Sequence, residues 1–314
     1  MRGLAALVCG VAAAVSAAQE FPARPLRMIV ASGAGGGTDL AGRNVAKTLS
    51  DQLKTAAFVE NKPGAGSATG SEFVAKSPPD GHTLLFSSGS SIVMNPFLYK
   101  NLPYDTLRDF VPVGFVAAYP FVLVTRGDLP AANLAEFAKY AKERPGRLTH
   151  SSPGVGSVQH VWGAILFRSM GLDLLHVPYK GAASAHPDII AGRIDSMFDN
   201  LSASLKHVES GRLKALAVSS PKRAPQLPQV PTVGETGAAK FEAESWMGLF
   251  APAATPQPVV ERLRALLLIT CRCQSAPCSA GVQPACSRSA CTIAASSPLP
   301  IPHCSTSWSV ASRR

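Results

Sequence analysis

Glycine loops and hydroxyl side chains are the groups in this sequence whose spacing suits ligand binding. Residues 27–40 read R-M-I-V-A-S-G-A-G-G-G-T-D-L. The apolar residues predict a short buried strand, and the glycines lead from it to a helix that begins at Thr38 or Asp39. Because the first N–H groups of a helix are unpaired and carry about half a positive charge, this segment is a candidate anion site.

A second loop repeats the pattern. A strand is predicted at residues 148–151, followed by the loop S-P-G-V-G at residues 152–156 and a helix at residues 157–169. Ser157 is suited to cap this helix, whose first N–H groups again point outward. The chain therefore contains two candidate anion-binding loops in separate parts of the sequence.

A nucleotide-dependent enzyme is the first alternative. Gly33 and Gly35 begin an incomplete dinucleotide fingerprint, because its third glycine position holds Thr38. Glu60, at the end of the second predicted strand, lies near the place where a ribose-binding acid is expected. An NAD-dependent α/β enzyme is therefore kept as an alternative, and a glycine turn that only packs the helix on the strand is the purely structural one.

The sequence contains no catalytic constellation. It has no G-x-S-x-G elbow, and Ser157 and His160 lie on adjacent turns of one helix, an arrangement that rarely makes a nucleophile and its base. His176, His186 and His207 lack the spacing of metal ligands. We therefore expect a protein that is not an enzyme and that has neither a cofactor nor a metal.

The elements that position the two loops alternate between strands and helices, which predicts an α/β protein with parallel sheets. Ligands bind at the carboxyl ends of such strands, and the strand predicted at residues 83–86 ends in Ser87 and Ser88. Apolar segments at residues 111–125 and 245–251 are suited to cross between two domains. We assign residues 19–125 plus 246–266 to lobe 1 and residues 126–245 to lobe 2.

Both ends of the chain differ from this body. Residues 1–18 have the layout of a secretory signal peptide: Arg2, an apolar run, then small residues. Residues 267–314 contain no Asp, Glu or Lys and hold six of the seven cysteines, at spacings that match no zinc site. We interpret this tail as the product of a reading-frame error in the gene and expect it to be disordered.

The net charge indicates anionic solutes rather than nucleic acid. It is +10 for the 314 residues, and half of it comes from Arg2 and four arginines of the tail. The lysines and arginines of the body are scattered. A modest positive balance of this kind attracts small anions and does not imply a nucleic-acid partner.

Eight sequence blocks occur in an order that resembles a known family. They are A-G-G-G-T-D at residues 34–39, E-N-K-P-G-A-G at 60–66, P-D-G at 79–81, N-L-P-Y-D at 101–105, S-P-G-V-G-S at 152–157 with His160, H-V-P-Y-K-G at 176–181, M-F-D-N at 197–200 and V-P-T at 230–232. From residue 21 to residue 266 the chain resembles the extracytoplasmic solute receptors of the tripartite tricarboxylate transporter family, the Bug-type receptors.

The resemblance implies a type II periplasmic binding protein, in which two α/β lobes enclose a cleft. We expect the hinge between the lobes near residues 122–125 and 246–251. Such a receptor is periplasmic and captures a small organic carboxylate. It delivers the carboxylate to the membrane permease subunits of a tripartite transporter, and we expect it to be a monomer. A receptor that feeds a signalling kinase is a further alternative.

The resemblance also implies which residues contact the ligand. In the family, backbone N–H groups and hydroxyls of two opposed loops hold the carboxylate, and Asp199 here is the position expected to read the distal group of the ligand. A second carboxylate close to Asp199 would be repelled. The implied ligand-binding residues are Gly35, Gly36, Gly37, Thr38, Asp39, Ser87, Ser88, Ser152, Gly154, Gly156, Ser157, His160 and Asp199.

Three features depart from the family pattern. Ala31 and Ser32 stand where a proline and an aromatic residue are usual, and His150 stands where a tyrosine is usual. We expect these changes to enlarge or polarise the cleft, and His150 to sharpen binding at mildly acid pH as its imidazole gains charge. The tail replaces helices that pack on lobe 1 in the family, so we expect the protein as written to be unstable or to aggregate.

Overall fold

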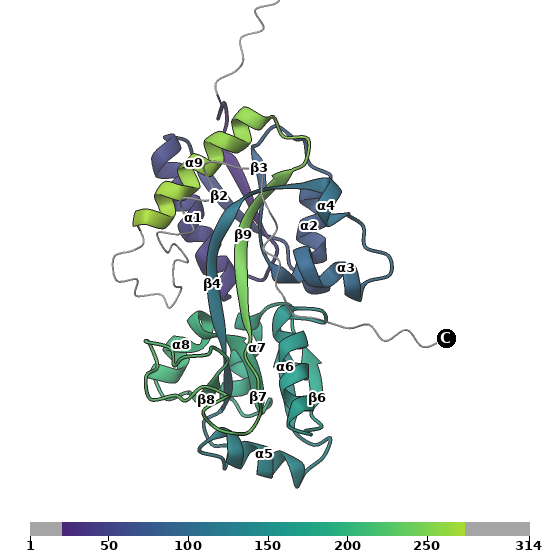
Figure 1. The fold of residues 1–314 in the computed structure, drawn as a ribbon, viewed down its shortest axis with the longest axis vertical. Coiled ribbons are helices and arrows are strands. Elements are labelled where there is room, and N and C mark those ends of the chain that lie inside the picture. The colour runs from purple at the N-terminus through teal and green to yellow at the C-terminus, as the bar shows by residue number, and fades with distance from the viewer. Residues whose placement is uncertain (1–20, 274–314) are drawn as a thin grey trace, which may run out of the picture. The chain divides into compact units, whose positions relative to one another are not determined.

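The computed structural model describes residues 21–273, all of which belong to one compact unit of the chain. The predicted signal peptide, and the predicted tail from residue 274 onward, lie outside the described residues. The described residues form strands and helices in alternation, which confirms the α/β class (Figure 1).

Lobe 1 is built on a sheet with the strand order β2 (Ala57–Asn61), β1 (Leu26–Val30), β3 (Thr83–Ser88), β9 (Glu244–Pro252) and β4 (Phe110–Arg126). The first three strands are parallel, whereas β9 is antiparallel to both β3 and β4. Met28, Ile29 and Val30 are all buried, as expected for a parallel strand with both faces covered. Its helices are α1 (Gly37–Leu53), α2 (Ala68–Ala75), α3 (Asn95–Leu98), α4 (Thr106–Asp109) and α9 (Gln257–Cys273).

Lobe 2 repeats this construction with its own parallel strands. In it β5 (Thr149–Ser152) lies between β6 (Leu175–Pro178) and β7 (Ser196–Asn200). The fourth strand, β8 (Leu213–Val218), is antiparallel to β4. The helices of lobe 2 are α5 (Leu134–Lys142), α6 (Val158–Ser169), α7 (Ala182–Ile190) and α8 (Leu201–Glu209).

Strand β4 belongs to both lobes. Its residues from Phe110 to Pro120 pair with β9, and those from Phe121 onward pair with β7 and β8 (Figure 1). The change of partner therefore falls at Pro120, not at residue 125 as expected, because residues 121–125 are fully buried strand residues of the second sheet.

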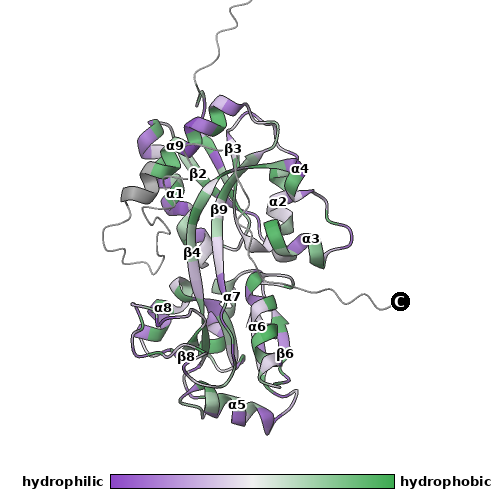
Figure 2. Ribbon diagram, viewed as in Figure 1, coloured by the Kyte–Doolittle hydropathy of each residue, from purple (hydrophilic) through white to green (hydrophobic). Residues whose placement is uncertain are grey.

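Apolar residues face the sheets and polar residues face outward. Helix α5 shows both kinds of surface in Figure 2, and its buried residues Leu134, Phe137 and Ala141 lie on one side of the helix. Helix α9 continues past Leu266, where we expected order to end, and Leu267 is buried next to Gly114. Helices α3, α4 and α8 were not predicted.

None of the helices within residues 21–273 combines the length and the apolarity that a membrane span requires.

Candidate ligand-binding site

Helix α1 begins at the carboxyl end of β1, as the glycine loop predicts. Gly36 precedes the helix in an extended conformation, and no side chain caps the helix. Gly37 and Thr38 form the start of its first turn, where both are buried. The first N–H groups of this helix therefore have no capping side chain, which leaves them suited to bind an anion.

Asp39 fixes the shape of the glycine loop. Its Oδ2 accepts hydrogen bonds from the N–H of Gly35 (2.9 Å) and from Arg43 Nε (2.9 Å), and its Oδ1 accepts one from Asn61 Nδ2 (2.8 Å). Burial alone would raise the pKa of Asp39, but these hydrogen bonds and the Arg43 charge lower that pKa below its ordinary value. Asp39 and the Gly35 N–H are thus engaged with one another inside lobe 1.

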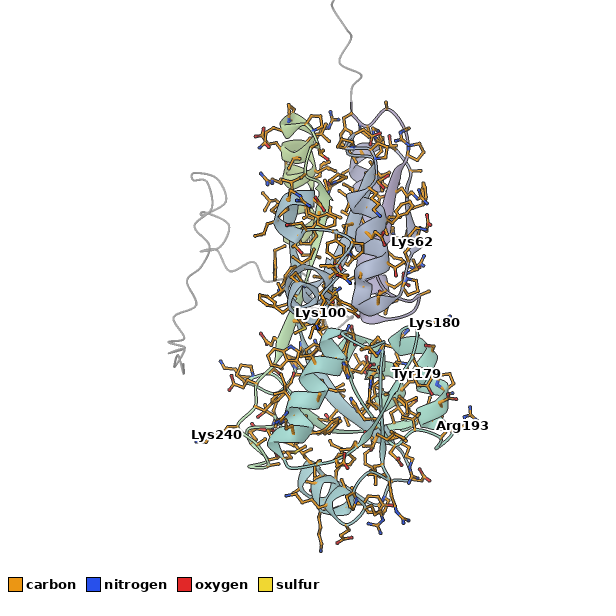
Figure 3. All side chains as sticks on the ribbon, turned by 90° about the vertical axis from the view of Figure 1, so that its right-hand side faces the viewer. Lys62, Lys100, Tyr179, Lys180, Arg193 and Lys240 are labelled. Atoms are coloured by element: carbon orange, nitrogen blue, oxygen red, sulfur yellow. The ribbon has the colours of Figure 1, made fainter. Side chains whose placement is uncertain are left out.

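The glycine loop meets lobe 2 directly. A methyl group at Gly33 would lie 2.6 Å from the carbonyl oxygen of Lys180, a residue labelled in Figure 3. One at Gly37 would lie 2.7 Å from Asn200 Nδ2 and 2.8 Å from Ser202 Oγ. These positions need glycine because the contact between the lobes leaves no room for a side chain.

Two helices of lobe 2 begin at this contact. Gly181 precedes α7 and Asn200 precedes α8, and neither residue caps its helix through a side chain. We call the region where residues 33–37 meet the first residues of α7 and α8 the lobe junction. Three helix N-termini, one from lobe 1 and two from lobe 2, thus converge here without side-chain caps.

The serines after β3 connect lobe 1 to lobe 2. Ser87 Oγ lies 2.7 Å from Ser91 Oγ, and Ser88 Oγ lies 3.2 Å from Ser90 Oγ. Ser90 Oγ accepts a hydrogen bond from the N–H of Val158 in lobe 2 (3.1 Å). Ser87 and Ser88, predicted to line the cleft, are buried and bonded to Ser91 and Ser90. Ser90, which makes the contact between the lobes, was not predicted.

Histidines support the second loop, residues 152–157, from inside lobe 2. Ser152 Oγ lies 2.7 Å from His176 Nε2, and the N–H of Gly156 donates to His160 Nδ1 (3.3 Å). The two imidazoles stack with their centroids 4.0 Å apart. Burial, with the neighbouring His160, lowers the pKa of His176 to about 4, and burial also lowers that of His160. Both rings are therefore neutral at neutral pH, and His160 shapes the loop.

The second loop faces a part of lobe 1 other than the glycine loop. A methyl group at Gly156 would lie 2.9 Å from the Tyr99 hydroxyl, and one at Gly66 would lie 3.0 Å from the carbonyl carbon of Gly156. Gly154 and Gly156 adopt φ angles of 144° and 78°, which favour glycine. Ser157 caps α6, as predicted, by accepting from the N–H of His160. Both loops lie between the lobes, but they have different direct partners.

His150 does not have the expected acid response. Its ring is buried against Phe167, and Nε2 has no hydrogen-bond partner among the described residues. Burial, together with repulsion from His176 and His160, lowers the pKa of His150 to about 3. The ring therefore stays neutral at mildly acid pH, and the expected gain of charge there is wrong because water does not reach the imidazole.

Asp199 is enclosed within lobe 2. Its Oδ2 lies 2.8 Å from His186 Nε2 and accepts a hydrogen bond from Ser204 Oγ (2.6 Å), while Oδ1 accepts from the N–H of Asn200 (2.7 Å). The side chain is fully buried. Both carboxylate oxygens are therefore occupied, and the next residue, Asn200, presents its amide to the lobe junction instead.

Several further polar side chains at the lobe junction are uncharged, and none of them is among the ligand-binding residues implied by the sequence. Gln159 Nε2 donates to Asn200 Oδ1 (3.2 Å). The Oγ atoms of Ser32 and Ser202 are shielded from solvent and have no hydrogen-bond partner among the described residues. The sequence pattern that could have predicted these residues is the spacing of Leu201 and Leu205, which lie one helical turn apart. It indicates helix α8, with Asn200 and Ser202 at its start.

Comparisons with known proteins show which family the chain resembles. The family model described as "Tripartite tricarboxylate transporter family receptor" matches residues 41–277. A protein from Pseudomonas sp. strain P51, encoded in the tcbD-tcbE intergenic region, is 41% identical over 246 residues, which are 78% of this chain and 73% of the relative.

Solved structures of the same kind share the fold. The periplasmic binding protein BugD is 37% identical with a TM-score of 0.77, over 82% of this chain and 85% of BugD. MatC from Rhodopseudomonas palustris with bound malate is 31% identical with a TM-score of 0.77, over 83% and 87% of the two chains. A second R. palustris protein, with adipate, is 33% identical with a TM-score of 0.76, over 79% and 83%.

The two-lobed α/β fold is thus that of periplasmic binding proteins, and the match of the family model covers most of the chain. The chain belongs to the receptors of the tripartite tricarboxylate transporter family, the Bug-type solute-binding proteins.

Proposed function

We propose that this protein binds a small organic carboxylate at the lobe junction, outside the cytoplasmic membrane, and delivers it to the permease of a tripartite transporter. The observation that carries the proposal is the meeting of three uncapped helix N-termini from the two lobes. An anion held there would gain hydrogen bonds from both lobes, so its binding would favour their contact. The bound malate and adipate of two related structures support a carboxylate.

Neutral donors are the groups available to such an anion. The glycine loop is bordered across the junction by Asn200, Ser202 and the alanines at the start of α7. The hydroxyls of Ser32 and Ser202 are further donors, one from each lobe. Several hydrogen bonds of this kind can stabilise a carboxylate without a guanidinium, because hydrogen bonds to a charged acceptor are about twice as strong as neutral ones.

A dinucleotide enzyme is less well supported. Glu60, the candidate ribose-binding acid, has one oxygen 2.5 Å from Arg27 and the other 2.8 Å from Lys62. Both oxygens are therefore occupied by ion pairs. We propose a binding function without catalysis, in a receptor exported by means of its N-terminal segment.

A thermal-shift screen tests the proposal with the full chain. Propionate, malate, adipate, citrate and NAD are compared, and titration calorimetry follows for each compound that raises the melting temperature. We expect stabilisation by at least one carboxylate and none by NAD. Stabilisation by NAD alone would refute the carboxylate receptor. Uptake of the bound carboxylate by cells with and without this gene then separates a transport receptor, whose loss abolishes uptake, from a receptor that serves a signalling kinase.

A further inference from the structure

A groove on lobe 1 lies outside the candidate ligand site. It has a volume of about 870 Å³, and all of its lining residues fall between Ile92 and Asp109. This segment includes α3 and α4 and the loop between them. We call it the α3–α4 groove.

The α3–α4 groove is bordered by unusually exposed apolar side chains. Leu107 is 95% exposed and Phe97 is 88% exposed, more than any other large apolar residue of the described part of the chain. Val93 and Leu98 are each about half exposed. A site for a small molecule encloses its ligand, whereas side chains that project into solvent fit a protein partner.

The segment is held firmly in this exposed position. Asn95 Nδ2 donates to the carbonyl of Gly66 (3.0 Å), and the Tyr104 hydroxyl donates to the carbonyl of Ser91 (2.8 Å). Asp105 caps α4 by accepting from the N–H groups of Leu107 and Arg108. The exposure of Phe97 and Leu107 is therefore set by an ordered framework.

The α3–α4 groove is continuous with the contact between the two lobes. Tyr99 lines the groove, and its hydroxyl donates to the carbonyl of Val155 in lobe 2 (3.1 Å). Gly156 also packs against the Tyr99 ring. A partner that occupies the groove therefore touches a residue that is hydrogen-bonded to lobe 2.

We propose that Phe97 and Leu107 anchor lobe 1 to the extracytoplasmic face of the membrane permease, through an apolar segment of the permease that occupies the α3–α4 groove. The inference rests on the proposed function. The permease is the partner that must distinguish a receptor with its lobes in contact, and the groove reports that contact through Tyr99. Lys100 lines the groove and has no ion-pair partner among the described residues, so an acidic residue beside the apolar segment completes the match (Figure 3).

Photo-crosslinking tests the docking surface in cells of the parent bacterium. The full chain carries p-benzoylphenylalanine at position 97, and a matched chain carries it at position 175, since Leu175 is an apolar residue of lobe 2 that is 59% exposed. We expect the first chain to crosslink to a polytopic membrane protein, identified by mass spectrometry as a tripartite permease subunit. We expect its yield to be about tenfold higher than from position 175, and to fall to the level of position 175 when Leu107→Ser is added.

A crosslink to a second copy of the chain, to its own C-terminal residues, or to no protein would overturn the docking surface, as would equal yields from positions 97 and 175. Binding of malate and adipate by both crosslinker chains is measured in the same preparations. Carboxylate binding without a permease crosslink contradicts only the docking surface, whereas failure of every carboxylate in the thermal-shift screen contradicts the proposed function on which it rests.

Discussion

Polar residues of the loops between the two lobes fall into two groups according to where their hydrogen bonds go. Asp39, Ser152 and Asp199 are buried and bonded inside their own lobes. Asn200 and Ser202 face the glycine loop across the junction. The first group fixes the shape of the loops, and we propose that the second group binds the ligand through hydrogen bonds.

Substitution of two glycines tests whether contact between the lobes is needed for ligand binding, independently of the stability of the fold. Gly33→Ala and Gly37→Ala would place a methyl group within 2.7 Å of Lys180 or Asn200 in lobe 2. We expect each to weaken carboxylate binding by about tenfold or more, because the lobes cannot approach fully. Titration calorimetry measures the affinity, and the melting temperature without ligand should change little.

Gly234→Ala, outside the lobe junction, is the matched control for these two variants. A methyl group at Gly234 would meet its nearest neighbour, Thr232 Oγ1, at 3.8 Å, which is an ordinary contact. We expect its affinity to remain within about twofold of the parent. Equal losses in all three variants would show that the clash across the junction is not the cause.

The His186–Asp199 pair gives lobe 2 a pH-dependent stability. Burial alone would lower the pKa of His186, but the Asp199 carboxylate raises it above 6.5. A raised pKa in the folded state means that the pair stabilises the protein below pH 6.5 and loses this effect as the pH rises through the folded pKa. Around the pair, Ser204 bonds to Asp199 and His207 packs edge-on against His186.

His186→Gln tests this dependence. We expect its melting temperature to fall furthest below that of the parent near pH 6, and the difference to shrink as the pH rises from there through the raised pKa and the parent His186 becomes neutral. Thermal melts across this range provide the measurement. A difference that stays constant with pH would mean that the pair contributes no charge interaction.

At the scale of elements, the N-termini of three helices form the candidate ligand site, and helix α9 packs on lobe 1. Helices α1, α7 and α8 bring their N-termini to the lobe junction because each follows directly on the end of a strand or on a glycine turn. Helix α9 packs against α1 and β4 on the other side of lobe 1 and extends to Cys273. The part of the final helix from Leu263 to Leu267 therefore contributes to the core.

Leu263→Ala should weaken lobe 1 strongly. Leu263 is fully buried in α9, and removing a buried leucine side chain costs about 2–5 kcal/mol of unfolding free energy. Urea unfolding measures the loss. Leu268→Ala in the same helix is the control, since Leu268 is 43% exposed and should cost less than about 0.5 kcal/mol. Equal losses would contradict the packing of α9.

At the scale of the whole molecule, two strands tie the lobes together. β4 and β9 pair along residues 110–120, and β4 then continues into the sheet of lobe 2. We therefore propose that rotation of one lobe against the other would bend these strands near Pro120, with strand pairing retained on both sides of it.

The protein as written is expected to be only marginally stable and prone to aggregate, with a folded monomeric fraction on which the other measurements are made. Leu40, Phe115 and Leu268 of lobe 1 are each between 43% and 48% exposed. Apolar surface left in water forgoes about 25 cal/mol per Å² of stabilisation. Size-exclusion chromatography provides the test, and elution of all of the protein as a monomer after prolonged storage would contradict the expectation.

Much of the fold follows from local patterns. The strand, glycine loop and helix at residues 26–53 were predicted because apolar periodicity and glycine act within a few residues. The strand β5 and the helix α6 were recognised in the same way, and the ordered motifs identified the family. Helix α8 was missed although its leucines repeat at helical spacing.

The sequence by itself determined that two glycine loops end buried strands in a two-lobed α/β receptor. The tertiary structure alone decided which groups face each other: residues 33–37 meet Lys180, Asn200 and Ser202, while Asp199 and His150 turn into the interior of lobe 2. The reason is physical, since strand and helix patterns depend on neighbours in the chain. Burial, and with it the pKa of His150 and the partners of Asp199, depends on residues far away in sequence.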